Sequence, residues 1–95
     1  MKSLLGNSVF FVQDYLGYLV AERGASPATV RAYQEDLCDY ITFLHETLQV
    51  QEPSDITRDE IVSFQSDLNK RGLAASTIAR RTSTIKSYHK FLVRE

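Results

Sequence analysis

Residues 26–48, SPATVRAYQEDLCDYITFLHETL, predict a long amphipathic helix. Ser26 followed by Pro27 is typical of an N-cap and a first helical position, because the missing proline amide costs no hydrogen bond there. Apolar residues then recur at steps of three and four, which is the helical period. They are Val30, Tyr33, Leu37, Ile41, Leu44 and Leu48.

Three further segments have helical periodicity. Asn7 or Ser8 can cap the first of them, and Thr57 with Glu60 has the spacing of a capping box at the start of another. Gly72 then ends that helix, and the last helix begins between residues 74 and 76. The expected helices cover about residues 8–23, 27–49, 58–71 and 75–94.

The composition supports one small helical domain. A chain of 95 residues with 43% apolar residues, two prolines and four glycines has room for a single core. We therefore expect an all-α, compact four-helix bundle over residues 1–95. The chain stops inside a good helical pattern, which favours a part of a longer protein.

Targeting and metal signals are missing from the sequence. Cys38 has no partner for a disulfide, and no Cys and His spacing suits zinc. The apolar run at residues 9–12 is too short for a signal peptide or a membrane span. We expect a soluble cytoplasmic protein without a cofactor, a metal ion, a membrane or a small-molecule substrate as partner.

Charge is divided unevenly along the chain. Residues 1–70 carry five basic and eleven acidic side chains, whereas residues 71–95 carry six basic and one acidic. The net charge of −1 hides this asymmetry, and the local density of cations decides whether a surface attracts phosphate. The last helix is therefore the candidate for contact with nucleic acid.

A helical wheel of residues 75–94 separates two faces. The expected inner stripe is Ile78, Thr82, Ile85, Tyr88 or His89, and Leu92. The opposite strip is basic and rich in hydroxyls, and it suits contact with a phosphate backbone and with base edges in a major groove. Its members are Ser76, Arg80, Ser83, Ser87, Lys90 and Arg94, with Thr77, Thr84 and Lys86 at the flanks.

An ordinary solvated helix face is the competing interpretation of this strip. Basic residues gather near helix C-termini because of the helix dipole, but Arg80 and Arg81 lie in the first half, where the dipole disfavours them. Thr29 and Arg31, near the start of the helix at residues 27–49, could meet phosphate end-on. Acidic residues follow them at Glu35, Asp36 and Asp39, so only the N-terminal end of that helix could face a polyanion.

Catalytic chemistry has little support in these residues. His45 and His89 lack metal-ligand partners at suitable spacing, and Cys38 has no neighbouring cation, so packing is the simpler role for all three. No glycine-rich phosphate loop or nucleophile motif is present. The prediction is a binding domain with no catalytic residues of its own.

Two blocks of sequence resemble the N-terminal core-binding domain of Xer-type tyrosine recombinases and phage-type integrases. The first block is YLVAERGASPATVRAY at residues 18–33, followed by Asp36-Leu37 and Phe43-Leu44. The second is ITRDEI at residues 56–61, followed by Gly72-Leu73, STIARRTSTIKSY at residues 76–88 and Phe91-Leu92. The resemblance covers roughly residues 9–95.

The resemblance implies a SAM-like helical bundle that binds one face of a recombination site. It implies double-stranded DNA and other protomers of a tetramer as partners, and a catalytic domain beyond residue 95. It also implies that the second and fourth helices approach the major groove. The DNA-contacting residues would be Thr29, Arg31, Thr77, Arg80, Arg81, Thr84, Lys86, Ser87 and Lys90, of which Arg81 could instead brace the bundle.

The catalytic motifs of that family have no match here. The tetrapeptides that start at His45 and His89 both lack the arginine of the family's His-x-x-Arg motif, so no tyrosine is assigned as a nucleophile. The resemblance therefore implies a domain that binds DNA and a parent enzyme that breaks and rejoins it. Two alternatives remain, a helical protein-interaction bundle without DNA affinity and a small stand-alone enzyme.

Overall fold

The described residues form four α-helices and one short 3₁₀-helix. The computed structural model describes the backbone of residues 10–94 and the side chains of residues 10–93. The elements are α1 (Val12–Arg23), α2 (Pro27–Glu46), η3 (Pro53–Asp55), α3 (Arg58–Lys70) and α4 (Ala75–Arg94). No strand occurs in these residues, so the predicted all-α class is confirmed. Within the same residues, no helix is both long and apolar enough to cross a bilayer.

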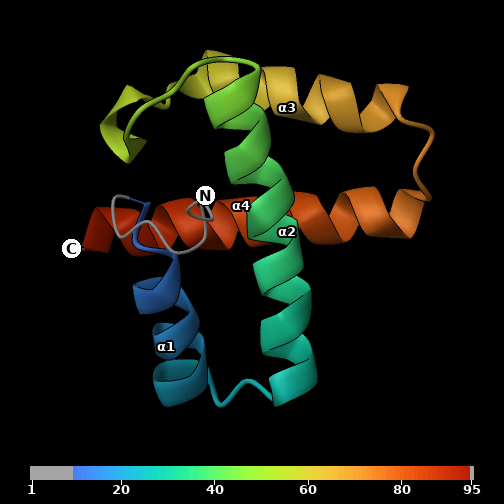
Figure 1. Cartoon of the computed structure of the whole chain (residues 1–95). Helices are drawn as coiled ribbons and strands as arrows, with labels where there is room; N and C mark the ends of the chain where they lie inside the picture. Colours follow the sequence, from blue (N-terminus) through green and yellow to red (C-terminus); the bar gives the residue numbers. More distant parts are fainter. Residues whose placement is uncertain (1–9, 95) are drawn as a thin grey trace.

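The helices are arranged as an orthogonal bundle. Figure 1 shows α1 and α2 as an antiparallel pair that crosses α4 steeply, while α3 lies beside α4 and runs in the opposite direction. The central helix is α2, which packs against α1, α3 and α4. Thus α4 lies across α1 and α2 and alongside α3 (Figure 1).

Side-chain caps fix the starts of α2 and α3. Ser26 Oγ accepts a hydrogen bond from the Thr29 amide at 3.2 Å, which satisfies one of the free amides of the first turn. At α3, Thr57 Oγ1 accepts from the Asp59 amide at 3.2 Å, and Glu60 Oε1 accepts from the Thr57 amide at 2.6 Å. The hydrogen bonds from Thr57 also hold the pKa of Glu60 below its usual value.

Left-handed residues follow three of the helices. Gly24, with φ of 61°, follows α1, and Gly72, with φ of 71°, comes shortly after α3, as expected of residues without a Cβ. The helix α2 ends at Glu46, three residues before its predicted end. Gln49 has φ of 58° and turns the chain so that Val50 is buried in the core.

The first helix begins later than the sequence predicted. It starts at Val12 instead of about residue 8, because Phe11, directly before Val12, is left-handed with φ of 56° and so cannot belong to the α-helix. Phe10, immediately before, is only 1% exposed and packs into the core. The predicted caps at Asn7 and Ser8 lie outside the described residues.

An aromatic cluster joins the helices at the centre of the core. The ring of Tyr88 on α4 lies 5.8 Å from the ring of Tyr15 on α1 and 6.4 Å from the ring of Tyr40 on α2. Tyr40 in turn lies 5.0 Å from Phe64 on α3. The Tyr88 hydroxyl donates to the Phe10 carbonyl at 2.8 Å, so its polar atom is satisfied. Burial raises the pKa of both Tyr40 and Tyr88.

The buried face of α4 is wider than the predicted inner stripe. Ile85 and Tyr88 are buried as expected, but Thr84 and Phe91 are also buried, while Thr82 is only partly covered. The reason is that α4 packs against α2 as well as α3, so a face wider than one stripe is covered. Thr84 therefore lies inside the bundle and not on its surface.

Candidate nucleic-acid interface

The outer face of α4 combines small side chains with cations. No acidic residue occurs anywhere in this helix, so the whole of α4 is neutral or basic. Small residues allow a second helix or a nucleic-acid backbone to approach closely, and the cations supply charge. The exposed members of this face, called the α4 outer strip below, are Ser76, Ala79, Arg80, Ser83, Lys86 and Lys90.

Two lysines of the α4 outer strip form no ion pair with any described residue. Lys86 and Lys90 are exposed, and within residues 10–93 neither forms an ion pair or a side-chain hydrogen bond. They are four residues apart, so both ammonium groups lie on the same side of the helix, one turn from each other. Their charge is available to an anion.

Arg80 is held differently, by a carboxylate inside the bundle. Asp36 on α2 is fully buried, and Arg80 Nη2 donates to its Oδ1 at 2.7 Å, while Arg80 Nε lies 3.2 and 3.3 Å from its two oxygens. Thr84 Oγ1 lies 2.8 Å from Asp36 Oδ2 and donates to it. Hydrogen bonding to Asp36 raises the pKa of Arg80. A buried charge needs such partners, and α4 supplies them.

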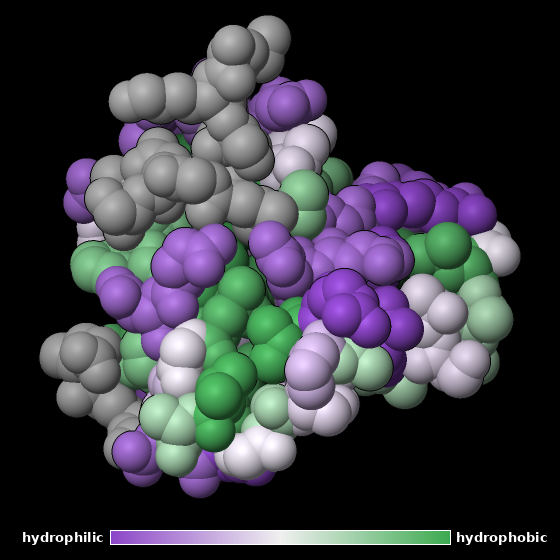
Figure 2. Space-filling view, turned by 60° about the horizontal axis from the view of Figure 1, so that its bottom comes forward, coloured by the Kyte–Doolittle hydropathy of each residue, from purple (hydrophilic) through white to green (hydrophobic). Residues whose placement is uncertain are grey.

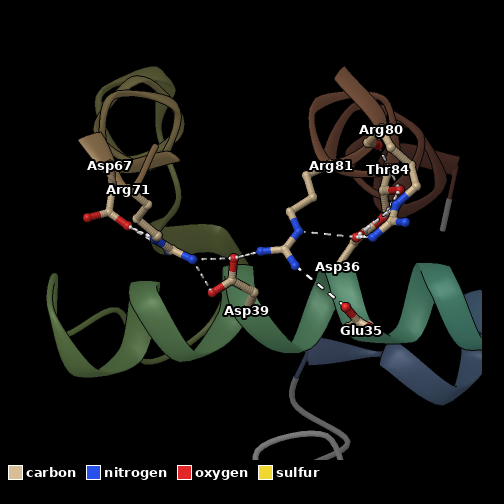
Figure 3. Close-up of polar contacts among 8 residues, drawn as sticks. All are labelled: Glu35, Asp36, Asp39, Asp67, Arg71, Arg80, Arg81 and Thr84. Carbon is tan, nitrogen blue, oxygen red and sulfur yellow. Dashed lines mark hydrogen bonds and ion pairs between the residues drawn. The ribbon is translucent and has the colours of Figure 1, made fainter. Parts of the chain in front are cut away.

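Asp39, one helical turn further along α2, joins three helices. Its carboxylate accepts from Arg81 of α4 and from Arg71 Nη1, just after α3, at 2.9 Å (Figure 3). Arg71 also donates to Asp67 of α3 through Nε at 2.7 Å. Arg81 has a side chain only 13% exposed, and its Nη2 also lies 3.6 Å from Glu35.

These ion pairs change the interpretation of three predicted contact residues. Thr84 is buried, so its predicted exposure to DNA is wrong, and Arg81 is buried enough to serve as a brace between helices. The position of Arg80 and Arg81 in the first half of α4 does not require a phosphate partner, because Asp36 and Asp39 compensate their charge. The acidic side of α2 contacts α4 directly.

The residues that form these contacts between α2 and α4 have the same sequence spacing on both helices. The acids at Glu35, Asp36 and Asp39 follow the pattern i, i+1, i+4, and so do the donors of α4, which are Arg80, Arg81 and Thr84. Residues three and four positions apart are neighbours on a helix surface, so each set forms one cluster, acidic on α2 and rich in donors on α4. A wheel drawn for one helix at a time cannot show this correspondence.

Two other predicted residues of α4 lie at the edge of the outer strip. Ser87 is half-buried and accepts a hydrogen bond from the Tyr15 hydroxyl at 2.7 Å, so its oxygen already helps to hold α1. Thr77 is also half-buried, in the first turn of the helix. Both retain some surface beside the cations.

The N-terminal turn of α2 holds the remaining two predicted residues. Thr29 and Arg31 are exposed, and the first turn of the helix contains no acid. Thr29 Oγ1 accepts from the Ser26 hydroxyl at 3.0 Å. Arg31 lies one turn before Glu35 on the same side of α2, and Glu35 approaches Arg81. Figure 1 shows that the start of α2 lies beyond its crossing with α4, and in Figure 2 the deepest purple, which marks the most hydrophilic residues, lies toward the right of the view.

The histidines and the cysteine take structural positions. His89 Nε2 and the Tyr40 hydroxyl share a hydrogen bond of 2.7 Å, and burial lowers the pKa of the imidazole. His45 Nδ1 lies 3.3 Å from the Val50 carbonyl, where the chain leaves α2. Cys38 is partly buried and free. Among the described residues, no three His, Cys, Asp or Glu side chains form a group that could hold a metal ion.

Comparison with known proteins identifies relatives of the whole bundle. Residues 12–95 match the family model described as phage integrase, N-terminal SAM-like domain. The chain is 34% identical over 84 residues to a protein named tyrosine recombinase XerD from Halalkalibacterium halodurans, and this match covers 88% of the chain and 28% of the relative. A tyrosine recombinase XerD from Chlorobaculum tepidum is 39% identical over 88% of the chain and 27% of its own length.

A second group of relatives gives the same result. A tyrosine recombinase XerC from Roseiflexus castenholzii is 38% identical over 81 residues, which are 85% of the chain and 26% of the relative. The chain thus spans little more than a quarter of the length of these relatives, and no solved structure matches it. With the family model matched over nearly the full length, the chain belongs to the phage integrase N-terminal SAM-like domain family.

Proposed function

We propose that this chain is the DNA-binding N-terminal domain of a Xer-type tyrosine recombinase. Its role is to hold double-stranded DNA at a recombination site in the cytoplasm, while a catalytic part of the parent protein breaks and rejoins the strands. Protomers of the parent assemble on DNA as a tetramer. The family match and relatives named as tyrosine recombinases support this proposal.

One observation carries the DNA-binding part of the proposal. Lys86 and Lys90 are exposed cations without ionic partners in the described residues, on a helix that contains no acid. The two arginines of α4 whose side chains are described, Arg80 and Arg81, already face carboxylates. Unpaired charge attracts phosphate most effectively, so the two lysines mark where the backbone of DNA binds.

The structure refines the set of proposed contacts. Lys86 and Lys90 bind phosphates, and Arg80 adds the exposed part of its guanidinium beside them. Arg81 and Thr84 position α4 from the inside instead of contacting DNA. The remaining contacts come from the half-buried residues of α4 and from the start of α2, which are Thr77, Ser87, Thr29 and Arg31.

A salt titration with a matched control tests this assignment. Fluorescence anisotropy of a labelled duplex, measured at several salt concentrations, compares the chain with the Lys86→Ala/Lys90→Ala variant. Each lost phosphate contact lowers the slope of log affinity against log salt by about 0.9, so we expect the slope to fall by roughly 1.8. Arg80 is unsuitable for this variant because its loss leaves Asp36 buried with fewer partners.

The control removes the same charge from α3. Arg58→Ala/Lys70→Ala deletes two exposed cations at the ends of that helix, neither of which has an ionic partner in the described residues. We expect this variant to bind DNA nearly as the unmodified chain does. Equal affinity and slope in the α4 variant would remove Lys86 and Lys90 from the interface. No binding by the unmodified chain at low salt would favour the protein-interaction bundle instead.

A further inference from the structure

The guanidinium of Arg80 uses only one of its edges inside the protein. Its Nε and Nη2 lie on the same side of the group and face the two oxygens of Asp36, at distances between 2.7 and 3.3 Å. Figure 3 shows this group between α4 and the carboxylate. Thr84 Oγ1 holds Asp36 Oδ2 from the next turn of the same helix, at 2.8 Å. The carboxylate is therefore fixed by two residues of α4.

The other edge of the same guanidinium is left without a partner. A guanidinium has five N–H donors, and Asp36 takes the two on the Nε side. The remaining three, on Nη1 and the far side of Nη2, have no acceptor among the described residues. The side chain is 42% exposed, so solvent or a ligand reaches these donors.

Arg81 provides an internal contrast at the same crossing. It also approaches Asp36, with Nε at 3.4 Å from Oδ1, but its side chain is only 13% exposed and its Nη atoms face Asp39 and Glu35. Both edges of Arg81 are thus turned toward carboxylates of α2. Of the two neighbouring arginines, Arg80 alone combines a buried anchor with an exposed fork.

We propose that Asp36 is a positioning residue for DNA recognition: it grips one edge of Arg80 so that the opposite edge binds a paired acceptor on DNA. Two phosphate oxygens or the O6 and N7 atoms of a guanine supply such a pair. An arginine already fixed by one edge loses less conformational freedom when it binds, which favours affinity. This inference rests on the proposed DNA-binding function and assigns Asp36 a role in that function.

The effect of Asp36→Asn on DNA affinity distinguishes a positioning role of Asp36 from a purely electrostatic one, because the two roles predict changes in opposite directions. Asp36→Asn removes a negative charge close to the binding face, and electrostatics alone would strengthen binding to DNA. If Asp36 positions Arg80, the same change weakens binding, by roughly 2-fold to 10-fold for one side chain that must now be ordered on binding. Asp39→Asn is the matched control, because it removes the same charge one turn away and does not touch Arg80.

A second variant tests the free edge without disturbing the charge. Arg80→Lys keeps a cation beside Asp36 but has no second edge to offer. We expect it to lose affinity while the salt slope stays nearly unchanged. Arginine side-chain spectra of the isotope-labelled protein supply a readout that a purely structural role would not move, since the Nη protons of Arg80 should shift when duplex DNA is added.

The outcomes distinguish this inference from the function on which it rests. All variants are compared at a temperature at which circular dichroism shows them folded. Weaker binding by Asp36→Asn and Arg80→Lys, with Asp39→Asn unaffected or tighter, supports the inference. A loss confined to guanine-containing duplexes identifies a base edge as the acceptor, and an equal loss on duplexes of A and T alone identifies phosphate.

Two results would overturn the inference. Binding by Asp36→Asn that equals or exceeds that of the unmodified chain excludes positioning by Asp36. If Asp36→Asn does not fold, unchanged affinity of Arg80→Lys excludes the second edge of Arg80 as a ligand. In either case, a reduced salt slope in the Lys86→Ala/Lys90→Ala variant would leave the proposed function intact.

Discussion

Replacement of Thr84 by valine should lower stability without affecting the shape of the core. The side chain is fully buried, and valine differs from it mainly by a methyl in place of the hydroxyl. The lost hydrogen bond goes to the buried carboxylate of Asp36, and such bonds to charged groups contribute about 1.5–3 kcal/mol. Because Arg80 and Arg81 still contact the same carboxylate, we expect a loss near the lower end, about 2 kcal/mol.

Thermal unfolding followed by circular dichroism measures this loss. For a domain of this size about 2 kcal/mol corresponds to a fall in Tm of roughly 8–16 °C. Two controls isolate the hydroxyl. Thr84→Ser keeps it and loses only a methyl, about 1 kcal/mol, whereas Thr82→Val removes a hydroxyl that makes no hydrogen bond in the described residues and should change stability by less than about 0.5 kcal/mol. A Tm for Thr84→Val equal to that of Thr82→Val would refute the role assigned to this bond.

Two further predictions concern local features. Thr57→Ala removes the cap of α3 and should lower the unfolding free energy by about 1 kcal/mol, as measured by urea titration; unchanged stability would mean that the capping hydrogen bonds contribute nothing. Burial lowers the pKa of His89 below 6.5, so the unfolded chain binds the proton more readily than the folded one. Stability should therefore fall as the pH drops below about 6.5, and this part of the pH dependence should disappear in His89→Gln; an identical profile in the variant would contradict it.

The features that the sequence predicted best are those decided within a few residues. The caps at Ser26 and Thr57 form as expected, since a cap depends on its own helix turn and on little else. The start of α4 at Ala75 also lies within the predicted interval. The start of α1 was missed because Phe11 takes a left-handed conformation that residues of its type rarely adopt.

The candidate site was harder to predict, because exposure depends on neighbouring helices. The basic strip of α4 was found from its periodicity, and its lysines are exposed. The wheel failed at Thr84 because whether a side chain faces water or α2 depends on the crossing of the two helices. Charges separated by more than forty positions, such as Asp36 and Arg80, meet only in the folded protein.

The position of α4 in the chain has a consequence for synthesis on the ribosome. This helix is the last of the four described helices to be translated. It carries Tyr88, whose ring closes the cluster between Tyr15 and Tyr40, and the Tyr88 hydroxyl also binds the Phe10 carbonyl. A nascent chain that ends before residue 75 thus lacks the residues of α4 that cover the aromatic cluster, and the emerging domain stays open to proteases until α4 has left the exit tunnel. This domain therefore completes its core only after α4 has been translated.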